Sequence, residues 1–310
     1  MTKNPLVSVI IPVYNRPVQL KTAIQSVLSQ EFQDFEIIVV DDCSLKPVLP
    51  IIGDLKHIRV IRHEVNRGAA AARNTGIRAA KGSLIGFLDS DDFWLPQKLQ
   101  NQVAVFKENK NLDLCFCAYN LVTISGLGNK LIYPYTPKVP KDGNWHRHLL
   151  VGCDFGPGST MLARKKLFSL YGFFNEEYTR SEDWEWFFRV SKNKKININI
   201  LDKVLVTVNN FTISSARDVE LANNKIIREF GVEFGQYKSF GKKALSKRYL
   251  ETSIYLFKER EIKKALPYFL KGFRIYPFHR AGYYALIFEA AFRIPIGDLW
   301  FRLKNHRMVK

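Results

Sequence analysis

Three short and almost wholly apolar runs near the start of the chain most limit how it can fold. They cover residues 7–13, 35–40 and 84–88, and a shorter strand-like run covers residues 58–62. Apolar runs of this length between polar segments are typical of buried strands. Helical spacing follows the first run, and an Ala-rich helical segment, residues 68–80, precedes the third. This alternation predicts the α/β class, with a mostly parallel, Rossmann-like sheet flanked by helices.

Acidic residues follow two of the predicted strands. They are Asp41 and Asp42 after the second run, and Asp89, Asp91 and Asp92, with Ser90 between the first two, after the third. Parallel strands share one carboxyl edge, where α/β proteins usually bind ligands, so both groups should lie there. Carboxylates this close repel one another unless a cation or hydrogen bonds hold them, and oxygen ligands favour Mg²⁺ or Mn²⁺. In the alternative interpretation these acids only form turns or cap the next helix.

A third acidic pair, Glu182 and Asp183, begins a predicted helix. Acidic residues are also favoured at helix N-termini by the dipole, which is the structural alternative to a catalytic role. The aromatic residues Trp184, Trp186 and Phe187 suit either stacking on a sugar ring or packing in a core. Between the third strand and this helix, the pattern predicts a helix over 95–109, a strand over 112–124, irregular structure over 125–158, a strand over 160–163 and a helix over 165–171.

The character of the chain changes after residue 215. Periodic helical segments over residues 221–230, 242–257, 261–276 and 282–292 replace the strand-like runs. We therefore predict two domains, residues 1–215 and 216–310, the second of them α-helical. Residues 249–276 loosely resemble a tetratricopeptide hairpin, although a single copy is not a repeat array.

The net charge of +18 indicates an anionic partner. Residues 216–310 hold 20 Lys and Arg against 9 Asp and Glu, together with clustered aromatic residues. This composition predicts peripheral attachment to the anionic inner face of the cell membrane. The alternative is that these helices pack on the first domain or mediate a homodimer. No apolar run approaches the length of a membrane-spanning helix, so we predict contact with a membrane without crossing it.

Four cysteines, Cys43, Cys115, Cys117 and Cys153, lack the paired spacing of a metal site. The N-terminal apolar run ends at Pro12, which favours a first strand over a secretory leader. We therefore expect reduced thiols and a cytoplasmic protein.

Five segments of the chain resemble glycosyltransferase family 2, an inverting family with the GT-A fold. They are VSVIIPVYNRP (7–17), FEIIVVDDCS (35–44), NRGAAAARNTGIRAAKGSLIGFLDSDD (66–92), STMLARKKLFSLYGFF (159–174) and SEDWEWFFRV (181–190). They occur in the order typical of the family. The resemblance ends near residue 190 and does not extend to residues 216–310.

The resemblance implies a role for each acidic group. It places Tyr14 against the nucleotide base, with Pro12 and Arg16 shaping that turn. The implied binding residues for the nucleotide sugar are Pro12, Tyr14, Arg16, Asp41, Asp42, Arg73, Asp89 and Ser90, with Ser90 serving mainly as a spacer. Asp91 and Asp89 would hold Mg²⁺ or Mn²⁺, and Asp92 is a weaker candidate. Asp183 would be the general base, with Glu182 beside it in the acceptor site.

Two positions depart from the family's pattern. Many relatives carry a His after the last core strand, where this chain reads VNNFTIS over residues 208–214. Either an Asn replaces it or the metal has one protein ligand fewer. Cys43 stands where Gly is commoner, which should alter the turn but not the carboxylates.

Together these features predict an inverting, metal-dependent glycosyltransferase that acts in cell-surface polysaccharide synthesis. It would move a sugar from a nucleotide-diphosphate donor to a glycan or a lipid-linked acceptor. The alternative is a non-catalytic module that binds a nucleotide sugar or a glycan through a degenerate site. A nucleic-acid partner is not predicted, because no basic stripe with interleaved aromatics and no reader motif is present.

Overall fold

The computed structural model describes residues 4–52, 58–124, 130–140, 142–151, 158–209, 215–279 and 281–292. The chain divides into two compact units. The sheet unit comprises Met1–Thr123, Ile132–Trp145 and Cys153–Phe211, and the helical unit comprises Ile124–Leu131, His146–Gly152 and Thr212–Lys310. Whether these units are independent domains with a boundary at residue 215 stays a prediction.

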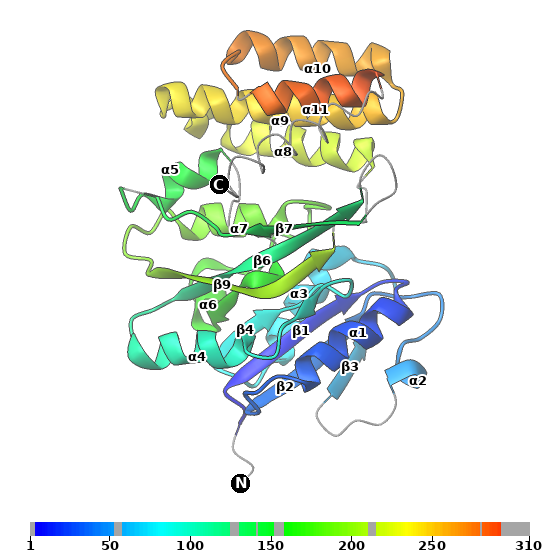
Figure 1. The fold of residues 1–310 in the computed structure, drawn as a ribbon, viewed down its shortest axis with the longest axis vertical. Coiled ribbons are helices and arrows are strands. Elements are labelled where there is room, and N and C mark those ends of the chain that lie inside the picture. The colour runs from blue at the N-terminus through cyan, green and yellow to red at the C-terminus, as the bar shows by residue number, and fades with distance from the viewer. Residues whose placement is uncertain are drawn as a thin grey trace. The chain divides into compact units, whose positions relative to one another are not determined.

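The sheet is mixed (Figure 1). In order across it, the strands are β3 (Ile58–Arg62), β2 (Phe35–Asp41), β1 (Val7–Val13), β4 (Leu84–Phe87), β8 (Leu162–Arg164), β6 (Leu114–Ile124), β9 (Ile198–Asn209) and β5 (Phe93–Trp94), and β7 (Lys130–Tyr135) pairs with β6. The first four strands are parallel, as the apolar runs predict. The antiparallel strand β8 then separates them from the parallel pair β6 and β9. The carboxyl ends of β1, β2 and β4 therefore meet at one edge.

Helices cover both faces of the first four strands. The helices of the sheet unit are α1 (Pro17–Leu28), α2 (Leu49–Ile52), α3 (Gly68–Ala79), α4 (Lys98–Glu108), α6 (Lys166–Tyr171) and α7 (Glu182–Val190). Alternate residues of β1, such as Val9 and Ile11, share a core with Leu20 of α1 and Leu99 of α4. Ile10 points to the other face, where a Cβ at Gly76 of α3 would approach its side chain to 2.4 Å. Glycine at this position therefore permits close packing of α3 on the sheet.

Two predicted segments differ from the structure, and one strand was not predicted. The segment predicted to be irregular, residues 125–158, contains β7 and a short helix, α5 (Trp145–Leu150), while residues 125–129, 141 and 152–157 lie outside the described residues. Strand β7 alternates exposed and half-buried residues and contains Pro134, which is tolerated at the edge of a sheet and masks the strand pattern. The helix predicted from residue 95 begins at Lys98, after the short strand β5. The long strand β9 was not delimited from the sequence.

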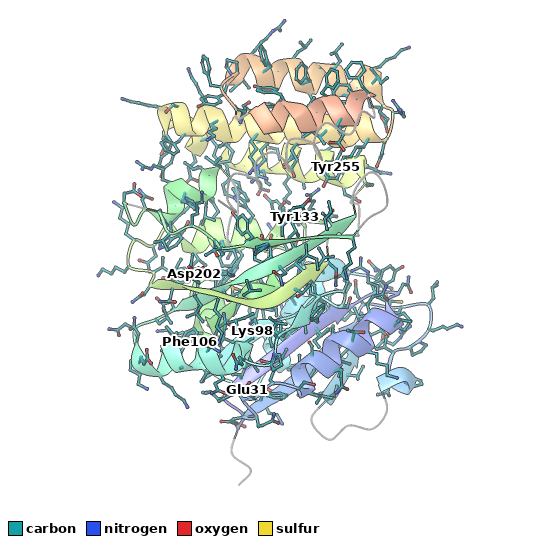
Figure 2. All side chains as sticks on the ribbon, in the orientation of Figure 1. Glu31, Lys98, Phe106, Tyr133, Asp202 and Tyr255 are labelled. Atoms are coloured by element: carbon teal, nitrogen blue, oxygen red, sulfur yellow. The ribbon has the colours of Figure 1, made fainter. Side chains whose placement is uncertain are left out.

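The interior of the sheet unit holds a buried lysine beside two thiols. Lys98 lies in α4 (Figure 2), where its ammonium donates to Gln102 over 2.7 Å and lies 3.9 Å from the Trp94 ring centre. Burial lowers the pKa of Lys98 to about 8, against the opposing effect of Cys117 and Cys115. Burial raises the pKa of Cys115 to about 12 and that of Cys117 to about 11. Both thiols are free, and they are too buried and too basic to act as nucleophiles.

Besides most of α5, the described part of the helical unit contains the four predicted helices. They are α8 (Ala216–Gly235), α9 (Lys238–Lys258), α10 (Ile262–Ile275) and α11 (Ala281–Phe292). Leu250 and Phe257 of α9 share a core with Ala265 of α10 and Ile287 of α11. A Cβ at Gly272 would lie 2.8 Å from Leu250, so α10 approaches α9 closely. In the part of the chain that the structure describes, none of the helices combines the length and hydropathy needed to span a membrane.

Candidate active site

The turn after β2 holds Asp41 in a fixed network. Asp41 is 1% exposed and accepts hydrogen bonds from the Ser44 backbone over 2.9 Å and from the Arg62 guanidinium. Burial alone would raise the pKa of Asp41, but hydrogen bonds from Ser44 and Arg62 bring it below its usual value. The same turn is tied to the loop after β1, because the Asn15 backbone donates to Ser44 Oγ over 2.9 Å.

Asp42 holds the N-terminus of α3. Its Oδ1 accepts from the Arg67 backbone over 2.9 Å, and its Oδ2 accepts from the Gly68 backbone over 2.7 Å. Orphan backbone N–H groups at a helix start are satisfied by such a carboxylate. His63 Nδ1 lies 2.7 Å from Asp42 Oδ1, and its Nε2 lies 2.9 Å from Thr75 Oγ1. Asp42 is 3% exposed. Its hydrogen bonds to the Arg67 and Gly68 backbone position the start of α3 at the edge of the site.

The turn after β4 separates its three acids by exposure. The side chains of Asp89 and Asp91 are 27% and 19% exposed, whereas Asp92 is buried. Asp92 accepts from Ser159 Oγ over 2.6 Å and from the Asn209 backbone over 2.9 Å. Burial, and then the charge of Asp89, raise the pKa of Asp92 well above its usual value, although these two hydrogen bonds oppose the change. Asp92 therefore fixes the turn, and Asp89 and Asp91 are the accessible carboxylates.

Arg73 of α3 connects this turn to α7. Its Nη2 donates to Asp89 Oδ1 over 2.6 Å, and its Nη1 donates to Glu182 Oε1. Arg73 is buried, and burial is the largest single influence and would lower its pKa, but the carboxylates of Asp89 and Glu182 together raise it. The Nε of Arg73 is also buried and has no hydrogen-bond partner within the described residues.

The start of α7 presents the third acidic pair. Ser181 precedes it with a left-handed φ of 64°, and the Trp184 backbone donates to Asp183 Oδ1 over 2.7 Å. Burial, followed by the charge of Glu182, raises the pKa of Asp183 to about 6, while Arg73 opposes the change. A carboxylate with a pKa near 6 is a stronger base than an ordinary aspartate and is still ionised at neutral pH.

The loop after β1 contributes a second arginine. Arg16 donates from Nη1 to Asp91 Oδ2 over 2.7 Å. Tyr14 on the same loop is 47% exposed and open to solvent, whereas Pro12 within β1 and Ser90 in the turn after β4 are buried.

Hydrogen bonds and ion pairs therefore join the loops and the helix start that carry the predicted site residues. The loops after β1 and β2 are joined by Asn15 and Ser44, the loops after β1 and β4 by Arg16 and Asp91, and the turn after β4 is joined to α7 by Arg73. Their assigned roles toward a donor or acceptor stay predictions.

The turn after β4 has the chemistry of a site for a hard cation. Asp89 and Asp91 offer accessible carboxylate oxygens, and Mg²⁺ typically uses one or two carboxylates together with substrate phosphates. Their present partners are guanidinium groups, with which a cation would compete. No group of three or more His, Cys, Asp or Glu side chains in the described residues is placed to hold a metal by protein ligands alone. In the segment where many relatives carry a His, residues 208–214, the Asn209 side chain donates to the Asp91 carbonyl. Residues 210–214 lie outside the described residues.

The suggested sugar-stacking role for the aromatic residues of α7 is wrong. Trp184, Trp186 and Phe187 are 2%, 0% and 2% exposed. Trp186 stacks on Phe168 with ring centres 4.7 Å apart, and its indole donates to the Gly172 carbonyl. These residues anchor α7, and with it the Glu182–Asp183 pair, in the core.

His63 and Ser159 are among the residues of the network that the sequence did not identify. His63 follows β3 directly, which puts it at the same carboxyl edge as Asp42. Ser159 accepts from the Asp89 backbone over 3.0 Å and donates to Asp92, which connects two acids of one turn. No local pattern marks Ser159 for this position.

Comparison with known proteins agrees with this arrangement. The sequence model of Glycosyl transferase family 2 matches residues 8–205. An uncharacterized glycosyltransferase of Haemophilus influenzae is 29% identical over 185 residues, which are 60% of this chain and 62% of that relative's length. The UDP-Glc:alpha-D-GlcNAc-diphosphoundecaprenol beta-1,3-glucosyltransferase WfgD of Escherichia coli is 29% identical over 62% of this chain and 72% of its own. The putative teichuronic acid biosynthesis glycosyltransferase TuaG of Bacillus subtilis is 38% identical over 39% of this chain and 50% of its own.

Solved structures share the fold. TarS of S. aureus, residues 1–349 in complex with UDP, has a TM-score of 0.54 and 20% identity, covering 86% of this chain and 89% of that one. The mannosyltransferase PcManGT of Pyrobaculum calidifontis, in complex with GDP-Man and Mn2+, has a TM-score of 0.55 and 14% identity, covering 94% and 80%. Both likenesses agree with the GT-A fold that the sequence motifs predict. The chain belongs to glycosyl transferase family 2.

Proposed function

We propose that the chain is an inverting transferase that moves a sugar from a nucleotide-diphosphate donor to an acceptor hydroxyl, with Asp183 as the general base. The observation that carries the proposal is the raised pKa of Asp183, about 6, at a helix start linked through Arg73 to the accessible Asp89. A base of this strength is suited to take a proton from an attacking hydroxyl near neutral pH. Inversion requires that hydroxyl to approach the anomeric carbon from the face opposite the leaving diphosphate.

The donor would lie along the carboxyl edge of β1, β2 and β4. Tyr14 is exposed there and can lie against a base, bordered by Pro12, Arg16, Asp41 and Asp42. Arg73 offers its unpaired Nε, and Asp89 offers a carboxylate for ribose hydroxyls. Two structures of TarS are complexes with UDP and with UDP-GlcNAc, which favours a uridine nucleotide as the first donor to test.

A divalent cation fits the same edge. Asp91 and Asp89 would hold Mg²⁺ or Mn²⁺, and Ser90 would space them. When bound, the ion would stabilise the negative charge of the leaving diphosphate. The Mn2+ named for PcManGT supports this choice of cation.

The acceptor is proposed to be a glycan or a lipid-linked saccharide used in cell-surface polysaccharide synthesis. The names of WfgD and TuaG, a diphosphoundecaprenol glucosyltransferase and a teichuronic acid enzyme, support this class. The described helices α8–α10 bear many Lys and Arg residues, which supports peripheral binding to an anionic membrane surface from the cytoplasm. A homodimer formed through these helices is the alternative use of that region.

The experiment is nucleotide release from a panel of UDP, GDP, CDP and dTDP sugars with Mn²⁺, in the wild type and in Asp183→Asn. Asp183→Asn should lower the rate by on the order of 10²–10⁴-fold, the usual contribution of a general base, with nucleotide affinity nearly unchanged. Asp202→Asn, at an exposed position of β9, is the matched control and should behave as wild type. Normal turnover by Asp183→Asn contradicts the assignment. Tight nucleotide-sugar binding without turnover by the wild type would favour the non-catalytic module.

A further inference from the structure

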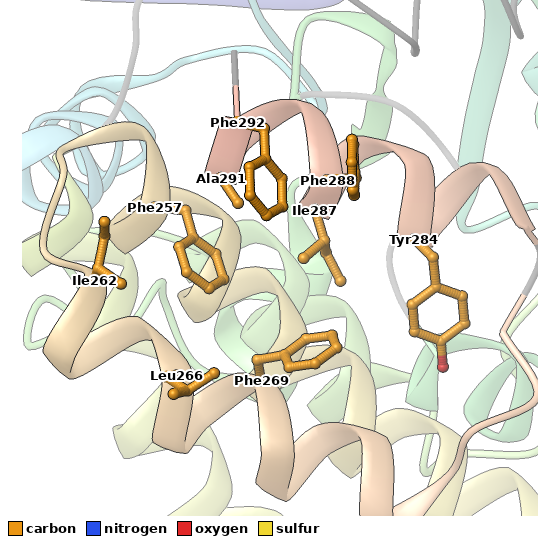
Figure 3. Close-up of a pocket in the computed structure, with 9 residues that line it drawn as sticks. All are labelled: Phe257, Ile262, Leu266, Phe269, Tyr284, Ile287, Phe288, Ala291 and Phe292. Carbon is orange, nitrogen blue, oxygen red and sulfur yellow. The ribbon is translucent and has the colours of Figure 1, made fainter. Parts of the chain in front are cut away.

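The helical unit contains an apolar cavity of about 450 Å³ that the family's sequence match does not cover. Its lining residues come from the end of α9, from α10 and from α11, and Figure 3 shows their side chains around one common space: Phe257, Ile262, Leu266, Phe269, Tyr284, Ile287, Phe288, Ala291 and Phe292. The volume lies within the range of about 300–1,000 Å³ typical of small-molecule sites. None of these lining residues is charged.

The cavity has a buried floor and an open rim. Phe257 and Ile287 are 7% and 5% exposed, whereas Leu266, Phe288 and Phe292 are 48%, 42% and 62% exposed. The one polar group on a lining side chain, the Tyr284 hydroxyl, donates to the Pro277 carbonyl over 2.7 Å. An exposed apolar rim of this kind is unfavourable in water and typical of a binding site for an apolar group.

Basic residues outnumber the acids Glu259 and Glu261 in the segment, residues 258–264, at one end of the cavity. Arg260, which is exposed, donates to the carbonyl of the lining residue Ala291 over 3.3 Å. Exposed Lys258 and Lys263 flank Phe257 and Ile262 in sequence, and α10 carries four Lys or Arg residues and no acid. A hydrocarbon cavity with cations at its mouth matches an amphiphile with a long apolar chain and a phosphate head.

We propose that this cavity holds part of the hydrocarbon chain of a polyprenyl diphosphate acceptor, with its phosphates beside Arg260. This inference rests on the proposed function for the acceptor class. A concave site is suited to enclose a single lipid hydrocarbon chain that has left the bilayer. A flat membrane surface, in contrast, is contacted by protruding side chains rather than by a cavity. The positive charge favours a phosphorylated lipid over the uncharged apolar face of a second copy of the chain.

The test is calorimetric titration of the full chain with geranylgeranyl diphosphate, with geranylgeraniol and with inorganic pyrophosphate. The wild type should bind the prenyl diphosphate saturably and pyrophosphate far more weakly. Leu266→Glu and Phe288→Glu should each weaken binding of the prenyl diphosphate by about tenfold or more, because they place a carboxylate on the rim. Val232→Glu is the matched control, since Val232 is 85% exposed on α8 outside the cavity, and it should bind as wild type does.

Two further measurements separate the possible occupants. Arg260→Gln should weaken binding of the diphosphate and leave binding of geranylgeraniol unchanged, and a benzophenone-bearing prenyl diphosphate should cross-link within residues 257–292. Equal binding of pyrophosphate and the prenyl diphosphate overturns the proposal, because only the head would then be recognised. A dimer in light scattering that Leu266→Glu dissociates, without lipid binding, assigns the cavity to a second copy and also overturns it.

The outcome is independent of the transfer chemistry. Asp183→Asn should retain prenyl diphosphate binding. Sugar transfer to a soluble glycan without any prenyl diphosphate binding would refute the cavity proposal and leave the proposed function standing. Prenyl diphosphate binding without turnover of any nucleotide sugar would refute the proposed function instead.

Discussion

Arg73 Nη2 lies 2.6 Å from Asp89 Oδ1, so a single buried guanidinium on α3 fixes the exposed acid at the end of β4. The same guanidinium donates to Glu182 at the start of α7. The donor edge and the proposed base are thereby connected through Arg73. The positive charge of Arg73 compensates the negative charges of Asp89 and Glu182.

Replacing Arg73 by Met should destabilise the protein strongly. Removing one partner of a buried ion pair leaves an uncompensated charge, here Glu182, at a cost of about 3–5 kcal/mol. Urea unfolding followed by circular dichroism measures the change. Arg78→Met is the control, because Arg78 is 53% exposed and 4.0 Å from Glu176, and a surface pair contributes about 0–1 kcal/mol. Equal unfolding midpoints for Arg73→Met and the wild type would show that the pair does not stabilise the fold.

The pH dependence of transfer should follow the ionisation of Asp183. Its pKa is raised to about 6, so kcat/KM should fall as the pH drops through about 6, where the base becomes protonated. The charge of Glu182 contributes to that raised pKa, so Glu182→Gln should move the midpoint of the profile to lower pH. Asp202→Asn should leave it in place. A midpoint that stays constant or rises in Glu182→Gln contradicts the assignment of the profile to Asp183.

The neighbouring acids Asp91 and Asp92 should have separable roles. Asp91→Asn should weaken Mn²⁺-dependent binding of a nucleoside diphosphate by about tenfold or more, because a lost charged contact costs about 1.5–3 kcal/mol. Asp92→Ala should leave the cation affinity unchanged but lower the free energy of unfolding by about 1–3 kcal/mol, because it leaves Ser159 Oγ and the Asn209 backbone without an acceptor. Titration with Mn²⁺ and urea unfolding of both variants distinguish these outcomes. Loss of cation binding in Asp92→Ala would make Asp92 part of the site.

The sequence alone predicts the four parallel strands and the acids at their ends, because both signals are local. Apolar runs identify β1, β2 and β4, and the position of Asp42 or Asp89 follows directly from where each run stops. The four C-terminal helices are predictable for the same reason, since their periodicity repeats within each segment.

The ion pairs between these acids and arginines could not be predicted, because they depend on contacts between distant parts of the chain. Arg73 and Glu182 are 109 residues apart, and Arg16 and Asp91 are 75 apart. A helical arginine has no preferred direction in the sequence, and only packing of α3 on the sheet orients it. The burial of Trp186 likewise depends on Phe168 from another helix. The apolar cavity of the helical unit is invisible in the sequence, because its residues have the same spacing as an ordinary helix core.

That packing of α3 can be tested directly at Gly76. A Cβ at this position would lie 2.4 Å from Ile10 Cγ2, and overpacking a core typically costs about 1–3 kcal/mol, so Gly76→Ala should lower the free energy of unfolding by that amount. Gly231→Ala is the matched control within α8, where the nearest atom is 4.0 Å away. There the higher helix propensity of Ala should stabilise by up to about 1 kcal/mol. Because Arg73 lies on the same helix, Gly76→Ala should also weaken nucleotide binding, which Gly231→Ala should not. A stabilised Gly76→Ala variant would mean that α3 does not depend on close contact with β1 for its position.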